Sequence, residues 1–238
     1  MYFGYGILRA NSLSEDQLKQ VQYPGNPCLI GENQLCMLCV EMKEESAVTP
    51  EGIRNYTRLL SQIVQMTAVI PLRFGTLFDE EEHVRNVLRQ NAKTYLKNLN
   101  QFDGKIEVEL RVWWKEEAFQ QAMLKKKRLS RWKKALEEGA GKGFDVVEFG
   151  KAISEVADQE RKEIEKTFVT VLRPFASKWL VKETSDELQA YDGVFLVEKT
   201  KEEEFDQAVG VLFNKYSEEM IFKYSGPWAP HHFVEGEK

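Results

Sequence analysis

The chain has 238 residues, of which 42% are hydrophobic and 30% are charged, and its formal net charge at pH 7 is −5. This length suffices for one large domain or two ordinary ones, and the negative charge argues against general affinity for nucleic acid or for an anionic membrane surface. No stretch approaches the roughly 18 apolar residues that a membrane helix needs. Because Arg9 interrupts the first apolar run and the 3 cysteines follow no secretory leader, we expect a protein of the reducing cytoplasm.

The first hundred residues predict an α+β unit with three strands and two helices. The expected strands are residues 2–9, 34–42 and 68–78. A connection with a short helical middle and a Pro-Gly turn joins the first two strands. Thr49 and Pro50 open a helix that lies before the third strand, since threonine suits the N-cap and proline the first helical position.

The segment 68–78, read Ala-Val-Ile-Pro-Leu-Arg-Phe-Gly-Thr-Leu-Phe, is the most concentrated pattern for a buried strand in the chain. Pro71 cannot donate a ladder hydrogen bond and therefore requires an edge, a strand start or a bulge, while Gly75 permits a bend. Arg73 lies between them and must reach solvent or find a partner. Asp79 follows as the expected N-cap of one helix over residues 80–102.

From Lys105 onward the pattern changes to strict alternation. Residues 105–114 predict a strand with Ile106 and Val108 among the residues of its buried face, and with Glu107, Glu109 and Arg111 on a solvated face. A charged helix over 116–138, a glycine-containing loop at 139–143 and a long helix from residue 145, broken near Pro174, are expected next.

The remaining elements complete a recognisable order. They are strands at 179–184 and 194–199, a helix at 205–216 and a strand at 220–224. Taken from Lys105, the order β-α-β-β-α-β is that of a ferredoxin-like domain with a helical insertion at about 116–143 after its first strand. The fold class is therefore α+β, with an N-terminal α+β domain at 1–103 and a C-terminal ferredoxin-like domain at 104–238.

Motifs with chemical potential are few, and each has a simpler interpretation. Cys36-Met-Leu-Cys39 has the spacing of a redox or zinc motif, but residues three apart in a strand point to opposite faces, which favours ordinary buried cysteines. The glycines of 139–143 lack the full phosphate-loop pattern. A basic patch around Trp132 is typical of a solvated helix face, and His231-His232 in an extended tail would point apart. The sequence thus predicts no enzyme, no cofactor and no metal site.

Three segments carry a resemblance to a known family. Residues 69–78, the opening Tyr2-Phe3-Gly4-Tyr5-Gly6-Ile7 and the closing Ser225-Gly226-Pro227-Trp228-Ala229-Pro230-His231-His232-Phe233 resemble motifs of the gas vesicle protein F/L family. The tail departs from the family pattern at Ala229 and at the two histidines, whereas Gly-Pro-Trp is kept. The resemblance implies a non-enzymatic accessory or minor structural protein that acts in the cytoplasm at the gas vesicle. Its implied partners are the small hydrophobic shell protein and other accessory proteins.

Arg73, Gly75, Pro227 and Trp228 are the candidate site residues. One interpretation is structural: the tail folds back, and Trp228 closes the core. The other is that Trp228 anchors the shell protein beside an exposed Arg73. The structural reading is preferred for Trp228, and both remain open for Arg73. A different class of function, a ligand-binding or regulatory protein on a ferredoxin-like sheet, would be favoured by an apolar pocket with convergent polar groups.

Overall fold

The computed structural model describes residues 1–21, 26–42, 49–126, 129, 134, 146–184 and 186–236. The chain divides into two compact units. The first unit comprises Met1–Val108, Glu198–Thr200 and Gly226–Lys238, and the second comprises Glu109–Val197 and Lys201–Ser225. The tail thus groups with the N-terminal residues. The predicted division into domains at 1–103 and 104–238 stays a prediction.

The sheet of the first unit is built around β1 (Tyr2–Arg9). On one side β1 pairs antiparallel with β3 (Leu35–Glu41), and β2 (Pro27–Glu32), which the sequence pattern did not predict, pairs with the far side of β3. On the other side β1 pairs with β4 (Ile70–Pro71) and β5 (Leu77–Phe78). The expected strands at 2–9 and 34–42 are confirmed to within a residue at each end.

The predicted continuous strand at 68–78 is wrong. Only the two short stretches β4 and β5 pair with β1, and a turn separates them, in which Arg73 accepts hydrogen bonds on its carbonyl from the backbone N (3.1 Å) and Oγ1 (2.7 Å) of Thr76. Gly75 has φ +93°, a conformation that L side chains rarely adopt, and it makes the turn possible. Pro71 does lie at a sheet edge, as expected, because β4 ends the strand order β2-β3-β1-β4.

Helices α1 (Glu15–Gln20) and α2 (Pro50–Met66) start as the capping rules predict. The Thr49 hydroxyl accepts a hydrogen bond of 3.0 Å from the Gly52 backbone N. The single helix expected at 80–102 is instead α3 (Glu81–Gln90) and α4 (Ala92–Phe102), which meet at Asn91. Asn91 bonds back through its Nδ2 to the Val87 carbonyl at 3.0 Å, a local competitor to helix continuation. The N-cap of α3 is Glu80, not Asp79.

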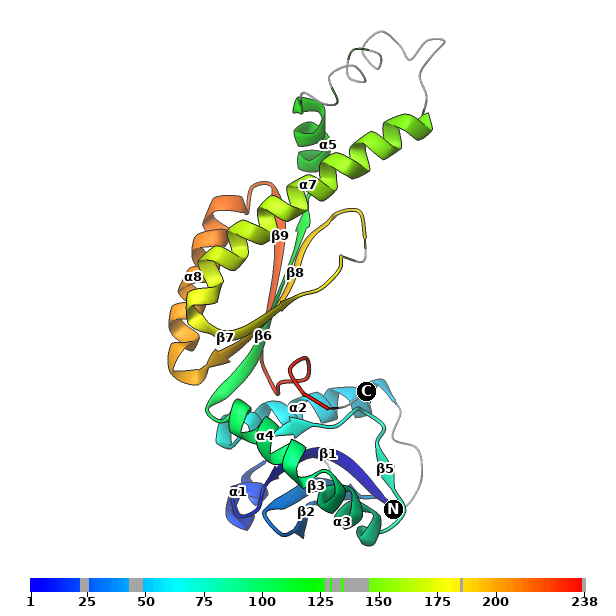
Figure 1. The fold of residues 1–238 in the computed structure, drawn as a ribbon, viewed down its shortest axis with the longest axis vertical. Helices are drawn as coiled ribbons and strands as arrows, with labels where there is room; N and C mark the ends of the chain where they lie inside the picture. Colours follow the sequence, from blue (N-terminus) through cyan, green and yellow to red (C-terminus); the bar gives the residue numbers. More distant parts are fainter. Residues whose placement is uncertain are drawn as a thin grey trace. The chain divides into compact units, whose positions relative to one another are not determined.

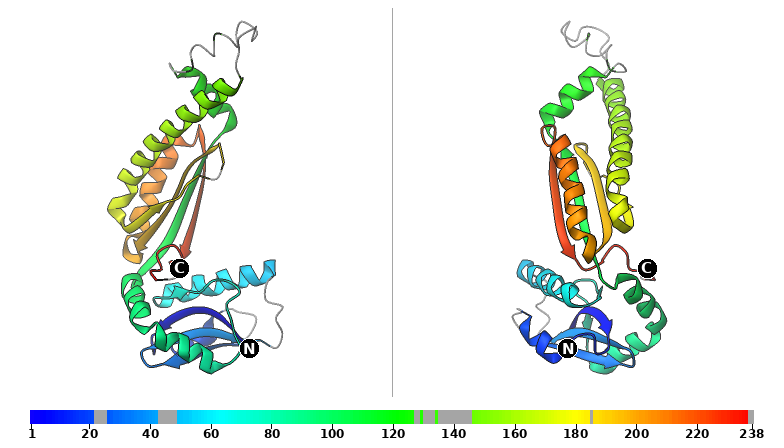
Figure 2. Two further views of the ribbon diagram at one scale, coloured as in Figure 1. Left: turned by 45° about the vertical axis from the view of Figure 1, so that its right-hand side comes forward. Right: turned by 90° about the vertical axis from the view of Figure 1, so that its left-hand side faces the viewer.

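The sheet of the second unit has the strand order β7-β8-β6-β9. Its strands are β6 (Lys105–Trp114), β7 (Ala176–Val181), β8 (Gln189–Glu198) and β9 (Met220–Trp228). Helix α7 (Val146–Leu172) connects β6 to β7, and α8 (Glu202–Tyr216) connects β8 to β9. Both helices cover the same face of the sheet (Figure 1, Figure 2). This order places the first and last strands side by side, as a β-α-β-β-α-β unit requires.

Two further details concern α7 and the inserted segment. Pro174 ends α7 and lies in the short 3₁₀ helix η2 (Arg173–Phe175), as expected; a second one, η3 (Lys199–Lys201), precedes α8. Of the helix expected at 116–138, the structure shows α5 (Glu116–Lys125). Trp132 and the predicted loop 139–143 lie outside the described residues. Met123, Leu129 and Val156 form a buried apolar cluster. The insertion therefore packs against α7 through this cluster.

Candidate functional site

The candidate residues Arg73, Gly75, Pro227 and Trp228 all belong to the first unit. Arg73 is exposed and lies with Gly75 in the turn between β4 and β5. The Gly226-Pro227 peptide is cis, and Trp228, the last residue of β9, is half-buried. Whether they bind a partner stays a prediction.

Glycine is required at position 226, inside β9 and shortly before the tail. Its φ is +142°, and a Cβ at this position would lie 2.9 Å from Val108 Cγ1 and 3.0 Å from the Glu107 carbonyl oxygen. Both distances are shorter than ordinary carbon contacts. The Gly-Pro-Trp segment is therefore fixed in conformation by its approach to β6.

The tail beyond Trp228 folds back onto the first unit, as the structural interpretation predicted. Ala229 and Phe233 are buried. Asn98 of α4 exchanges two hydrogen bonds with the Glu235 backbone, one through Nδ2 and one through Oδ1, each 2.9 Å long. Lys97 adds an ion pair of 2.7 Å to the Glu235 carboxylate. The tail thus closes the core, while Trp228 itself is not among the buried residues.

A ring cluster centred on Tyr56 of α2 brings the tail to the β4–β5 turn. The Tyr56 ring lies 5.4 Å from Phe74 and 6.2 Å from His231, between centroids. Its hydroxyl donates a hydrogen bond to the Leu72 carbonyl. Arg73, between Leu72 and Phe74 in sequence, is consequently held at a turn whose neighbours are both fixed by Tyr56. Burial lowers the pKa of His231, more than the nearby Glu107 carboxylate raises it.

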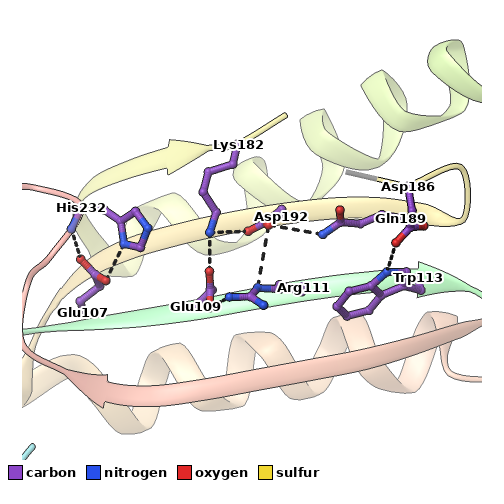
Figure 3. A network of polar contacts seen from close by, with 9 residues as sticks. All are labelled: Glu107, Glu109, Arg111, Trp113, Lys182, Asp186, Gln189, Asp192 and His232. Atoms are coloured by element: carbon purple, nitrogen blue, oxygen red, sulfur yellow. Dashed lines mark hydrogen bonds and ion pairs between the residues drawn. The ribbon is translucent and has the colours of Figure 1, made fainter. Parts of the chain in front are cut away.

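Glu107 of β6 forms the second attachment of the tail (Figure 3). The residue is 2% exposed. Its Oε2 accepts a hydrogen bond of 2.8 Å from the His232 backbone N, and its Oε1 lies 2.7 Å from His232 Nδ1. A buried carboxylate requires such partners, because an unpaired charge away from water is costly.

The second unit holds a separate charge network on the same strand (Figure 3). Glu109 lies 2.5 Å from both Lys182 Nζ and Arg111 Nη2, and Lys182 Nζ lies 3.1 Å from Asp192 Oδ1. Burial raises the pKa of Glu109, but the hydrogen bonds from Lys182 and Arg111 outweigh it, so the pKa is lowered. Burial lowers the pKa of Lys182, and its bonds to Glu109 and Asp192 raise it further than that. Glu109 and Lys182 are therefore both charged at neutral pH.

The solvated face predicted for β6 is therefore wrong at Glu107 and Glu109. Alternation separates the two faces of a strand correctly, but it does not say whether water covers the polar one. The missed partners, His232 and Lys182, lie more than seventy positions along the chain from their carboxylates. A basic residue in the tail and another after β7 were the signals available in the sequence.

The cysteines are ordinary residues of the first-unit sheet. Cys36 and Cys39 are buried and free, and burial raises the pKa of Cys36 to about 11. Within the described residues, no group of three His, Cys, Asp or Glu side chains could hold a metal ion. The interpretation of Cys36 and Cys39 as buried structural residues is confirmed.

A groove of about 980 Å³ borders α1 and β2 in the first unit. Its lining includes Leu13, Leu18 and Leu29, together with Ser14 and Lys19. The Ser14 hydroxyl accepts a hydrogen bond from Gln17 N, and Lys19 pairs with Asp16. These two polar side chains thus stabilise α1.

The whole chain matches a known family. The model of the family described as gas vesicle synthesis protein GvpL/GvpF matches residues 2–235. The chain belongs to this family. In the part of the chain that the structure describes, no helix combines the length and apolar character needed to cross a membrane. The match confirms the resemblance seen in the three sequence segments, and it identifies a gas vesicle protein.

Individual relatives agree with the family match. Gas vesicle protein F of Dolichospermum flosaquae is 24% identical over 208 residues, which cover 85% of each chain. Gas vesicle protein F of a Streptomyces species is 24% identical over 245 residues and covers 97% of this chain and 98% of its own.

The fold is also that of solved members. The crystal structure of GvpF from Microcystis aeruginosa superposes with a TM-score of 0.82 at 18% identity and covers 98% of both chains. The structure of GvpF from Anabaena sp. PCC7120 gives 0.79 at 21% identity, covering 100% of this chain and 97% of its own. These likenesses confirm the predicted α+β fold.

Proposed function

We propose that this GvpL/GvpF-family chain is a non-enzymatic accessory or minor structural protein that binds the hydrophobic shell protein and supports gas vesicle assembly in the cytoplasm. The family match over residues 2–235 carries this proposal. The interior of the chain supports it too, because the paired charges of β6 are engaged with structural partners: Glu107 holds the tail, and Glu109 holds Lys182.

The proposed binding surface lies around the β4–β5 turn. Arg73 is exposed, and the two residues beside it are fixed through Tyr56, so the guanidinium is carried on a rigid support. A rigid support lowers the entropy lost on binding. Trp228 is half-buried, so part of the residue is exposed to a partner.

The test is capture of the shell protein by the full chain, with folding checked by thermal melting. Arg73→Ala is expected to melt like the parent and to capture less shell protein. Arg54→Ala, which removes an exposed arginine from α2, is the matched control and should capture as the parent does. Equal capture by both variants would remove Arg73 from the interface, and no capture by the parent would refute the proposed partner.

Trp228 needs its own comparison because it has two candidate roles. If its ring closes the core, Trp228→Ala melts early, with a loss on the order of 3 kcal/mol from the usual truncation series. If it is an anchor, the variant melts like the parent and loses the shell protein. Trp179→Ala, at an exposed tryptophan of β7, controls for the general effect of removing a surface indole.

A further inference from the structure

The outer edge of β9 in the second unit is an unprotected strand edge. β9 ends the strand order β7-β8-β6-β9, and within the part of the chain that the structure describes no strand pairs with its outer side. Such an edge presents a row of unpaired backbone groups, and proteins usually blunt it with charges, proline or a bulge. The opposite edge, β7, has an irregular register between Ala176 and Lys178. From Met220 to Ser225, Lys223 is the sole charged residue.

Large apolar side chains gather at this edge. Ile221 is 54% exposed, and Phe213 of the neighbouring α8 is 48% exposed. The Phe213 ring meets Phe222 edge-on, with 5.6 Å between centroids. Tyr224 is exposed as well and donates a hydrogen bond of 2.6 Å to Asp206 of α8. An apolar, hydrogen-bonding edge of this kind is suited to adding another strand.

We propose that this edge pairs with the same edge of a second copy of the chain, antiparallel, around a two-fold axis that passes beside Ile221. The symmetric arrangement uses one self-complementary patch and closes as a dimer.

The direction of the backbone groups follows from one hydrogen bond. The backbone N of Lys115, the residue after β6, donates to the Glu219 carbonyl at 2.9 Å, so this carbonyl points toward β6. Backbone groups alternate in direction along an antiparallel strand. The N–H and C=O groups of Met220, Phe222 and Tyr224 therefore point outward and are available to the second copy.

The side chains select the register. With Ile221 opposite its own copy, Met220 is hydrogen-bonded to Phe222 of the second copy, and Glu219, the turn residue that precedes β9, comes opposite Lys223. Glu219 and Lys223 are both exposed. Because of the two-fold axis, the pair of Glu219 with Lys223 and the pair of Met220 with Phe222 each form twice in the dimer. Moving the axis to Lys223 would place two lysines directly opposite each other, which is destabilising. The centre at Ile221 brings the opposite charges together and buries Ile221, the most exposed large apolar side chain of the strand.

The charge pairing gives the first test, sedimentation equilibrium of the full chain. The parent is expected to reach the mass of two 27.6 kDa chains as concentration rises. Lys223→Glu and Glu219→Lys should each weaken the dimer at least tenfold, and the double variant should restore it. Lys178→Glu, on the β7 edge, should leave it unchanged. A monomeric parent, a double variant as weak as the single variants, or a loss with Lys178→Glu would overturn the proposal.

Cross-linking gives a second test that does not depend on charge. Ile221 and its copy form a non-hydrogen-bonded pair, in which Cα atoms lie about 4.5 Å apart. Ile221→Cys should therefore form an inter-chain disulfide when oxidised glutathione accepts the electrons of the two thiols. Two Lys223→Cys sites would be roughly 14 Å apart, four residues along the strand, and should not cross-link. The parent, which keeps its native cysteines, is the background control. Equal cross-linking at both positions, or none at Ile221→Cys, would overturn the register and the two-fold axis.

Discussion

Replacing His232 by alanine is expected to destabilise the first unit, because the change removes a partner from a buried carboxylate. The Glu107 side chain is 3% exposed, and its Oε1 lies 2.7 Å from His232 Nδ1. Alanine keeps the backbone N–H that bonds Oε2 at 2.8 Å, so one of the two contacts survives. A hydrogen bond to a charged group contributes about 1.5–3 kcal/mol, and the carboxylate left behind stays buried. We therefore expect a loss of about 2–3 kcal/mol in the free energy of unfolding.

The measurement is urea unfolding together with thermal melting. In a chain of this length, 1 kcal/mol corresponds to roughly 2–4 °C in Tm, so the expected fall is about 4–12 °C. His83→Ala is the matched control, since the His83 side chain is 54% exposed and lies 3.6 Å from Glu80. Exposed pairs of that kind contribute about 0–1 kcal/mol. If His232→Ala unfolds no more easily than His83→Ala, the Glu107 contact does not stabilise the tail.

A double-mutant cycle separates the contact from the cost of the orphaned charge. The double variant Glu107→Leu/His232→Ala removes both partners and leaves no buried charge. Its loss in the free energy of unfolding should therefore be smaller than the sum of the losses in the two single variants. Additive losses would show that the two side chains do not interact.

Three further predictions concern other parts of the chain. Gly75→Ala should lower Tm by the equivalent of roughly 1–2 kcal/mol, because Gly75 has a φ of +93°. Gly150→Ala, inside α7 and with open space around it, should raise Tm. A higher Tm for Gly75→Ala than for Gly150→Ala would contradict the turn geometry. Met123→Ala should cost about 2–5 kcal/mol, since Met123 is buried in the cluster with Val156, and an unchanged melting curve would show that the insertion is dispensable. The pKa of His231 is lowered by burial, so the stability that neutral His231 provides is complete above the unfolded pKa of about 6.5 and is lost as pH falls below it. His231→Phe should therefore reduce the fall in Tm between pH 7.5 and 5.5. An unchanged fall in Tm would show that His231 is not the group that titrates.

Local signals predicted most elements of the fold. The cap at Thr49, the alternation of residues 105–114 and the β-α-β-β-α-β order each depend on neighbours in sequence, and each corresponds to an observed element. The errors arose where a local signal was overridden. The apolar run at 68–78 suits a strand, but the turn fixed by Thr76 and Gly75 divides it. Helical periodicity runs through 80–102, but the Asn91 side chain bonds to the backbone at the junction.

The candidate site was less predictable, because its contacts join distant parts of the chain. The sequence marked Gly226-Pro227-Trp228 as a turn before a returning tail, and the tail does return. Nothing local specified that His232 would meet Glu107, since the alternating pattern around Glu107 is that of a strand with one wet face. The tertiary fold decides whether the polar face of β6 is buried and which residue contacts Glu107. The sequence shows only that Glu107 is a charged residue that needs a partner if it is buried.

The two buried carboxylates of β6 restrict which segments of the chain can pack against them. A buried ion pair contributes little to stability compared with well-packed apolar side chains, so Glu107 and Glu109 are poor choices if stability alone matters. Each of them, however, accepts from one particular distant segment: Glu107 from the tail at His232, and Glu109 from Lys182 after β7. An apolar side chain at either position could pack against many segments, whereas a buried carboxylate is satisfied only by one that brings donors. The charges on β6 thus favour one path for the tail and one for the segment after β7, and they disfavour alternatives that would leave a carboxylate unpaired.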